Sequence, residues 1–179
     1  MSKFEKAMKG LFVAGTLVAA GSSFAATQGD LGATSQGTIE VMVEIVDQIQ
    51  ISGLIDITGG YVPGEDFTGS SPACVFRNGT TGEFDVTISS QNGTGTDFRL
   101  NDAGTFVTYD VTFDDGTSGA IDMNHAELDN TSFDNASNEN PTCGGDAQST
   151  IAITVPDANL GAVGAGTYAD TLTILVAPR

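Results

Sequence analysis

The residues from Thr38 to Ile45 read Thr-Ile-Glu-Val-Met-Val-Glu-Ile, and this stretch decides the fold class. Apolar residues take every second position, which would place Ile39, Val41, Val43 and Ile45 on one face. A period of two residues is the pattern of a half-buried β-strand, because successive side chains of a strand point to opposite sides. The stretch therefore predicts a strand with one apolar face.

The same period recurs along the rest of the chain. It predicts strands over 48–57, 83–89, 97–101, 105–113, 150–155 and 167–177, with a short one near 120–123. Turn-forming pairs such as Asn78-Gly79 and Asn92-Gly93 separate these runs, and Gly53 is expected to mark a kink or bulge. Helical periodicity is nearly absent. We predict an all-β fold, a β-sandwich of immunoglobulin-like size.

The first 25 residues have the form of a secretory signal peptide. Three lysines precede an apolar run over 11–20, and small residues lead to an expected cleavage site after Ala25. The run is too short to span a bilayer, which takes about 20 apolar residues. We therefore expect a mature chain of residues 26–179 that is exported and not inserted in a membrane.

The mature chain would be strongly acidic. The whole sequence carries 23 acidic and 6 basic residues, for a net charge of -17. Three lysines and one glutamate lie in the leader, so the mature part carries 3 minus 22, about -19 before the termini. Such a chain repels nucleic acid and anionic lipid. We expect no nucleic-acid partner and interpret the acidity mainly as a source of solubility.

The chain contains two cysteines, Cys74 and Cys143. An even number in an exported protein predicts a disulfide, and two cysteines allow only one pairing within a chain. Such a bond would close a long loop and stabilise the fold by ~2–4 kcal/mol.

The segment 114–145 differs from the rest because it is rich in Asp, Asn, Ser and Gly. We expect one long exposed excursion, with the chain's single histidine, His125, on its surface. A calcium site is an open alternative, although the spacing is not that of an EF-hand. Its candidate oxygen ligands are Asp122, Asn124, Glu127, Asp129, Asp134 and Glu139.

Known catalytic motifs do not stand out. The sequence has no Gly-x-Ser-x-Gly elbow, P-loop or Gly-x-Gly-x-x-Gly motif, and one histidine makes a catalytic triad improbable. We predict that the chain is not an enzyme and needs no cofactor or resident metal.

Two segments of the mature chain resemble a known family. The stretches 34–45 and 49–57 look like the opening of spore coat protein U-like subunits, the pilins of the archaic chaperone–usher pathway. The ending 165–176 looks like the last strand of those subunits, and Cys74 before Val75-Phe76 also fits. The resemblance lies in strand patterns and covers most of the mature chain.

The resemblance implies an incomplete immunoglobulin-like sandwich that lacks its final strand. Residues 26–46 would be an N-terminal donor-strand extension and residues 47–179 the pilin domain. A periplasmic chaperone lends a strand in transit, and at the outer-membrane usher the extension of the next subunit replaces it, a form of β-strand addition. The donor side chains would be Ile39, Val41, Val43 and Ile45, and the acceptor groove would contain Ile49, Ile51, Leu172, Ile174 and Val176.

These features lead to two functional hypotheses. The first is a structural subunit that polymerises with copies of itself into a bacterial surface fibre used for adhesion or biofilm formation. The second is a stand-alone secreted β-sandwich that binds glycans or calcium. The N-terminal arm discriminates between them, since only a fibre subunit needs that arm free of its own sheet.

Overall fold

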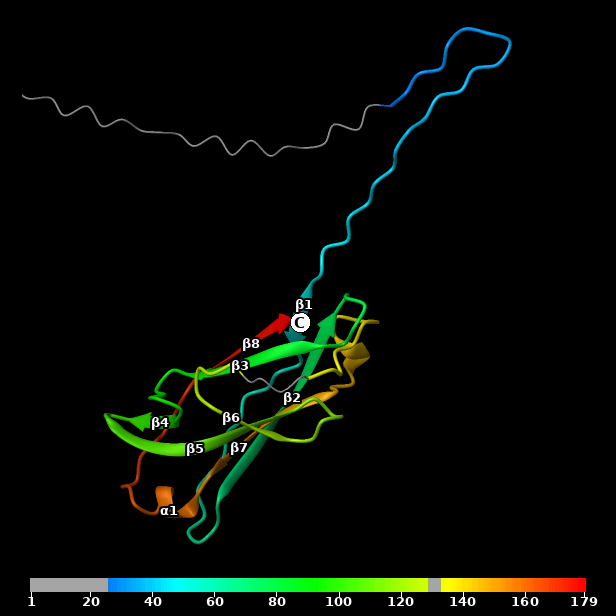
Figure 1. Ribbon diagram of the computed structural model, residues 1–179. Helices are drawn as coiled ribbons and strands as arrows, with labels where there is room; N and C mark the ends of the chain where they lie inside the picture. Colours follow the sequence, from blue (N-terminus) through cyan, green and yellow to red (C-terminus); the bar gives the residue numbers. More distant parts are fainter. Residues whose placement is uncertain (1–25, 129–132) are drawn as a thin grey trace, which may run out of the picture. The chain divides into compact units, whose positions relative to one another are not determined.

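The computed structural model describes residues 26–128 and 133–179. The expected signal peptide, residues 1–25, lies outside the described residues. The chain divides into two compact units, one ending at Ile45 and the other running from Val46 to Arg179. Figure 1 shows that the second unit is built almost entirely from strands.

The strands of the second unit form two antiparallel sheets (Figure 1). The larger has the order β1-β2-β7-β5-β4, with β6 also paired to β5, and the smaller pairs β3 with β8. The strand bounds are β1 Ile49–Ser52, β2 Phe67–Arg77, β3 Phe84–Ser90, β4 Phe98–Asp102, β5 Thr105–Asp114, β6 Ile121–Met123, β7 Ser149–Val155 and β8 Leu172–Pro178. One helical turn, α1 (Asp157–Leu160), follows β7, and a 3-10 turn spans Cys143–Gly145. The all-β, sandwich-like prediction is confirmed.

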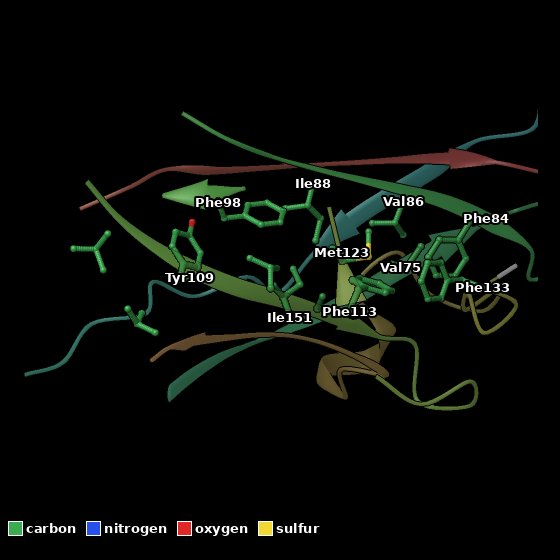
Figure 2. Close-up of a cluster of buried hydrophobic side chains, with 14 residues drawn as sticks. Val75, Phe84, Val86, Ile88, Phe98, Tyr109, Phe113, Met123, Phe133 and Ile151 are labelled. Atoms are coloured by element: carbon green, nitrogen blue, oxygen red, sulfur yellow. The ribbon is translucent and has the colours of Figure 1, made fainter. Parts of the chain in front are cut away.

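The core lies between the two sheets. Figure 2 shows the side chains of β3 meeting those of β5 and β7, with Phe84, Phe113 and Phe133 in mutual contact. Their ring centroids lie 4.8 to 6.1 Å apart. The alternating pattern of β3 accounts for its share of the core, since Phe84, Val86 and Ile88 are fully buried while the residues between them are not. The period of two therefore sets which face of β3 is apolar.

Strand β2 is the element that the sequence pattern did not reveal in full. Gly69 and Pro72 interrupt its first half, and no strand was predicted between 57 and 83, although the family resemblance placed Cys74 before a strand. Pro72 is tolerated because β2 changes partner at this point. Residues 67–73 pair with β7, and residues 74–77 pair with β1 on the other edge.

The predicted strand over 48–57 ends early. Strand β1 stops at Ser52, and Gly53 takes a positive φ of 79°, which confirms the expected kink. Beyond it the Ile55 N–H donates to the Ser71 hydroxyl instead of to a ladder partner. A glycine allows this left-handed conformation at no steric cost, so the chain leaves the strand here.

The acidic segment 114–145 is mostly exposed, as expected, but it also contributes residues to the core, which was not expected. Phe133 is fully buried in the core, and its carbonyl accepts a hydrogen bond from the Phe84 N–H. Asp115 is also fully buried. The segment closes over the outer edge of β3 through bridges at Phe133 and Leu128. The predicted short strand is present as β6.

The two cysteines form the predicted disulfide. Cys74 in β2 is bonded to Cys143, 69 residues further along the chain. The bond fastens the far end of the acidic segment to the larger sheet.

Candidate functional site

The candidate site is a pair of strand edges that have no ladder partner in residues 26–128 and 133–179. Among these described residues, strand β1 pairs only with β2, and β8 pairs only with β3. The two strands lie close together, yet within the described residues no backbone hydrogen bond joins them. We call the free edges of β1 and β8 the open edges. Each carries backbone N–H and C=O groups that a further strand could pair with.

Two other edges of the sandwich are covered. The outer edge of β3 is bridged by Phe133 and Leu128, and the outer edge of β4 is bridged at Asn101 by Ala169. Asn101 and Ala169 exchange two backbone hydrogen bonds of 2.9 and 3.1 Å. The open edges of β1 and β8 therefore differ from the covered edges of β3 and β4.

The core is incompletely covered along the open edges. The core-facing residues of β8 stand directly opposite those of β3, as in the pairs Ile88–Ile174 and Val86–Val176. The β3 members are fully buried, whereas the β8 members are only half-buried. Half-buried side chains that also pack against the core are Ile49, Ile51, Leu172, Ile174 and Val176, the five predicted groove residues.

The predicted donor residues lie in the first unit. Residues 39–48 belong to no strand, although their alternation is typical of one. The side chains of Ile39, Val41, Val43 and Ile45 are 80–84 % exposed. A strand needs a ladder partner, and no described part of the same chain supplies one for these residues.

The residues between the predicted donor residues and β1 are held at the end of β2. The Arg77 guanidinium donates to both oxygens of Asp47, with an Nη2–Oδ2 distance of 2.6 Å and Nε contacts of 3.1 and 3.2 Å. The hydrogen bond from Arg77 holds the pKa of Asp47 below its ordinary value. No local sequence pattern indicated this pairing, because the two residues are 30 positions apart.

The start of β8 is fixed by a buried tyrosine. The Tyr109 hydroxyl in β5 donates to Asp170 at 2.6 Å, and the other Asp170 oxygen accepts from Asn92 N–H and Nδ2 at 3.1 and 3.0 Å. Burial first, and the bond to Asp170 second, raise the pKa of Tyr109. This network sets where β8 begins, two residues beyond Asp170.

His125 is a structural residue, and its placement on the surface of an exposed loop was wrong. It is half-buried, and its Nδ1 accepts a hydrogen bond of 2.9 Å from the Ser90 N–H at the end of β3. Its ring meets Phe98 edge to face, with centroids 5.9 Å apart. It thus holds the acidic segment against the smaller sheet.

The calcium alternative finds no cluster among the residues that can be described. Outside 1–25 and 129–132, no three His, Cys, Asp or Glu side chains gather closely enough to hold a metal ion. Of the candidate ligands, Asp129 lies outside the described residues. Glu127 accepts a hydrogen bond from Asn124, and Asp134 accepts one from Thr117.

In residues 26–128 and 133–179, no helix is long and apolar enough to cross a membrane.

Comparisons with known proteins add no relative. No protein-family model matches the sequence, and no curated protein matches it.

Proposed function

We propose that the mature chain is a structural subunit of a bacterial surface fibre that polymerises by donating its N-terminal arm to the open edges of the next copy. One observation carries the proposal. A sandwich with two unpaired edges and a half-buried apolar row belongs to the same chain as an exposed arm with apolar side chains at every second residue. The arm has apolar side chains but no ladder partner, and the sandwich has unpaired edges beside a half-buried apolar row.

The dimensions of the two parts agree. The alternating stretch 39–45 has seven residues, and so has β8. A donor strand paired with β8 would place its apolar face on the core and complete the ladder on both sides. Four apolar side chains buried in this way contribute ~6–12 kcal/mol before the cost of ordering the arm.

The route to the surface is part of the proposal. A disulfide is typical of an oxidising compartment, and the leader has the form of a secretory signal. The resemblance to spore coat protein U-like pilins gives the transit partners, a periplasmic chaperone and an outer-membrane usher. In this proposal the chain has no catalytic activity and binds no cofactor. It acts in adhesion or biofilm formation as part of the fibre.

The test compares two forms of the protein, with and without residues 26–46, after expression in a periplasm. Negative-stain microscopy and electrophoresis without boiling would report assembly. The proposal expects fibres or SDS-resistant ladders from the full mature chain and none from the truncated chain. If both forms are equally stable folded monomers, the arm is not a donor. A stand-alone binding module would then be the better hypothesis.

A further inference from the structure

The further inference concerns the three residues that join the arm to β1, namely Val46, Asp47 and Gln48, and it rests on the proposed function. A chain that carries both a donor arm and open edges can in principle fill its own edges. An arm used in this way would end polymerisation, because it would leave nothing to donate. The joining residues are held by hydrogen bonds. These bonds affect whether the arm fills its own edges or the edges of another copy.

Two consecutive residues at the end of β2, Arg77 and Asn78, hold the whole joining segment. Asn78 Oδ1 accepts from the Gln48 N–H at 2.6 Å, its N–H donates to the Gln48 carbonyl at 3.1 Å, and its Nδ2 donates to the Val46 carbonyl at 2.9 Å. Arg77 grips the Asp47 carboxylate between them. We call Arg77 and Asn78 the root clamp.

Arg77 is itself fixed. It is only 7 % exposed, and its Nη1 donates to the Thr81 hydroxyl at 3.2 Å and to the Glu83 carbonyl. Gly79 leaves room for the fork, since a Cβ there would lie 2.7 Å from Arg77 Nε and 3.2 Å from an Asp47 oxygen. The guanidinium is therefore pre-positioned, and little side-chain freedom is lost when it binds Asp47.

The clamp continues the β1–β2 pairing beyond the end of β1. Ile49 is the ladder partner of Arg77, and Gln48 takes the next position opposite Asn78. For the arm to lie along the free edge of its own β1, the chain would have to reverse direction between Ile45 and Ile49. That reversal falls on the clamped residues and would break their bonds to Asn78 and Arg77.

The joining residues are also poor turn formers. A hairpin loop this short needs residues with positive φ, usually Gly or Asn. Val46 is β-branched and disfavours that conformation. The sequence and the clamp thus oppose the same reversal.

We infer that the root clamp, Arg77 and Asn78 acting on Val46–Gln48, disfavours insertion of the arm into its own open edges and so reserves it for a second copy of the chain. Arg77 and Asn78 are positioning residues, since they hold Val46–Gln48, and Arg77 pairs with β1 on the side opposite its open edge.

The test uses the full mature chain refolded over a range of concentrations. One variant, Asp47→Ala with Asn78→Ala, removes the clamp. The matched control, Thr81→Ala, removes a contact of the same guanidinium but leaves 46–48 held. The readouts are the monomer fraction by size-exclusion chromatography and amide exchange of β8 in that fraction. Where the double variant fails to fold, Asp47→Asn serves instead, because it keeps the side-chain shape.

If the root clamp disfavours insertion of the arm into its own edges, the double variant should yield a monomer whose β8 amides are protected. Its fraction should be independent of concentration and about tenfold or more above that of the parent and of Thr81→Ala. Asp47→Asn should shift the fraction in the same direction by less. Polymerisation of the folded clamp variants with the same concentration dependence as the parent would overturn the inference alone. A parent that stays monomeric with unprotected β8 amides would overturn the proposed function, and the inference with it.

Discussion

The hydroxyl of Tyr109 in β5 lies 2.6 Å from the carboxylate of Asp170, two residues before β8 begins. The bond crosses from the larger sheet to the smaller one. Because it fixes the start of β8, it also fixes where the open edge of β8 begins. Tyr109 is nearly fully buried, so this contact is shielded from water.

We therefore expect Tyr109→Phe to lower the free energy of unfolding by roughly 1.5–3 kcal/mol at neutral pH, the usual range for a hydrogen bond to a charged group. Urea denaturation of the chain lacking residues 26–46 would measure it. Tyr61→Phe is the matched control, since its hydroxyl donates to Asp157 in a solvent-exposed hydrogen bond, which should contribute less to stability. Equal effects of the two substitutions would contradict the role assigned to Tyr109.

The raised pKa of Tyr109 also predicts a pH dependence. A group whose pKa is higher in the folded state stabilises the fold below its unfolded value of 10.0, and this contribution is lost as the pH rises above that value. The parent should lose stability above about pH 10 more steeply than Tyr109→Phe does. Parallel alkaline limbs for the two proteins in pH-dependent thermal melts would argue against it.

The donor arm offers a test that leaves the domain unchanged. Val41 and Met42 are neighbours, 84 % and 67 % exposed, and alternation would put only Val41 on the core of the next copy. Val41→Asp should weaken assembly by about 100-fold or more, because a carboxylate would be buried without a partner. Met42→Asp carries the same charge on the opposite face.

Sedimentation of the assembled fibre would measure how much of the Val41→Asp and Met42→Asp proteins assembles. We expect Met42→Asp to assemble nearly as the parent does and both variants to melt as the parent monomer does. If the two substitutions reduce assembly equally, the arm does not bind through one face.

Phe133 gives the acidic segment a role in the core. Its ring packs on Phe84 and Phe113 and is fully buried, so Phe133→Ala should cost ~3–5 kcal/mol of stability. Leu128 in the same segment is 54 % exposed, and Leu128→Ala should change stability by about 0.5 kcal/mol or less. Chemical denaturation would measure the loss of stability in each variant. A small effect at Phe133 would mean that the segment does not close the core.

Asp115 predicts how the fold responds to acid. Its buried carboxylate accepts from the Thr117, Ser118 and Asp134 backbone N–H groups at 3.0, 2.7 and 3.1 Å. Burial alone would raise the pKa of Asp115, but these donors outweigh it and hold the pKa below the ordinary 3.8. The stabilisation is therefore present above pH 3.8 and is lost as the pH falls through the lower, folded-state value.

Replacing Asp115 by Asn would test this assignment. The variant should lose roughly 1–3 kcal/mol at neutral pH, because an amide cannot accept all these bonds. It should also show a shallower loss of stability in acid than the parent. Identical acid limbs in the two proteins would show that Asp115 does not carry the effect.

Local pattern was enough to predict most of this fold. Alternation located β3, β4, β5, β7 and the inward residues of β8, because each of these strands has one face on the core. It also placed the arm residues on one face, whereas the family resemblance assigned the five residues beside the open edges to a groove. Contacts between residues far apart in the sequence could not be predicted from local pattern. The pairing of Arg77 with Asp47 and the burial of Phe133 depend on segments that meet only after folding.

Two errors have a common physical cause. A segment rich in Asp, Asn and Gly was expected to be exposed, yet Asp115 is buried because backbone N–H groups satisfy its charge. Strand β2 was not predicted from the pattern, because Gly69 and Pro72 weaken the strand pattern of its first half. In both cases tertiary contacts compensate for an unfavourable local residue type.

Amide exchange of β8 can show whether the arm of one copy pairs with the open edge of another. The chain without residues 26–46 is measured alone and with a synthetic peptide of residues 36–46, and then with the Val41→Asp form of that peptide. We expect the native peptide to protect the β8 amides that point away from β3, and the altered peptide to leave their exchange unchanged. If those amides are already protected without peptide, or if neither peptide changes their exchange, β8 does not present an open edge for the arm of another copy.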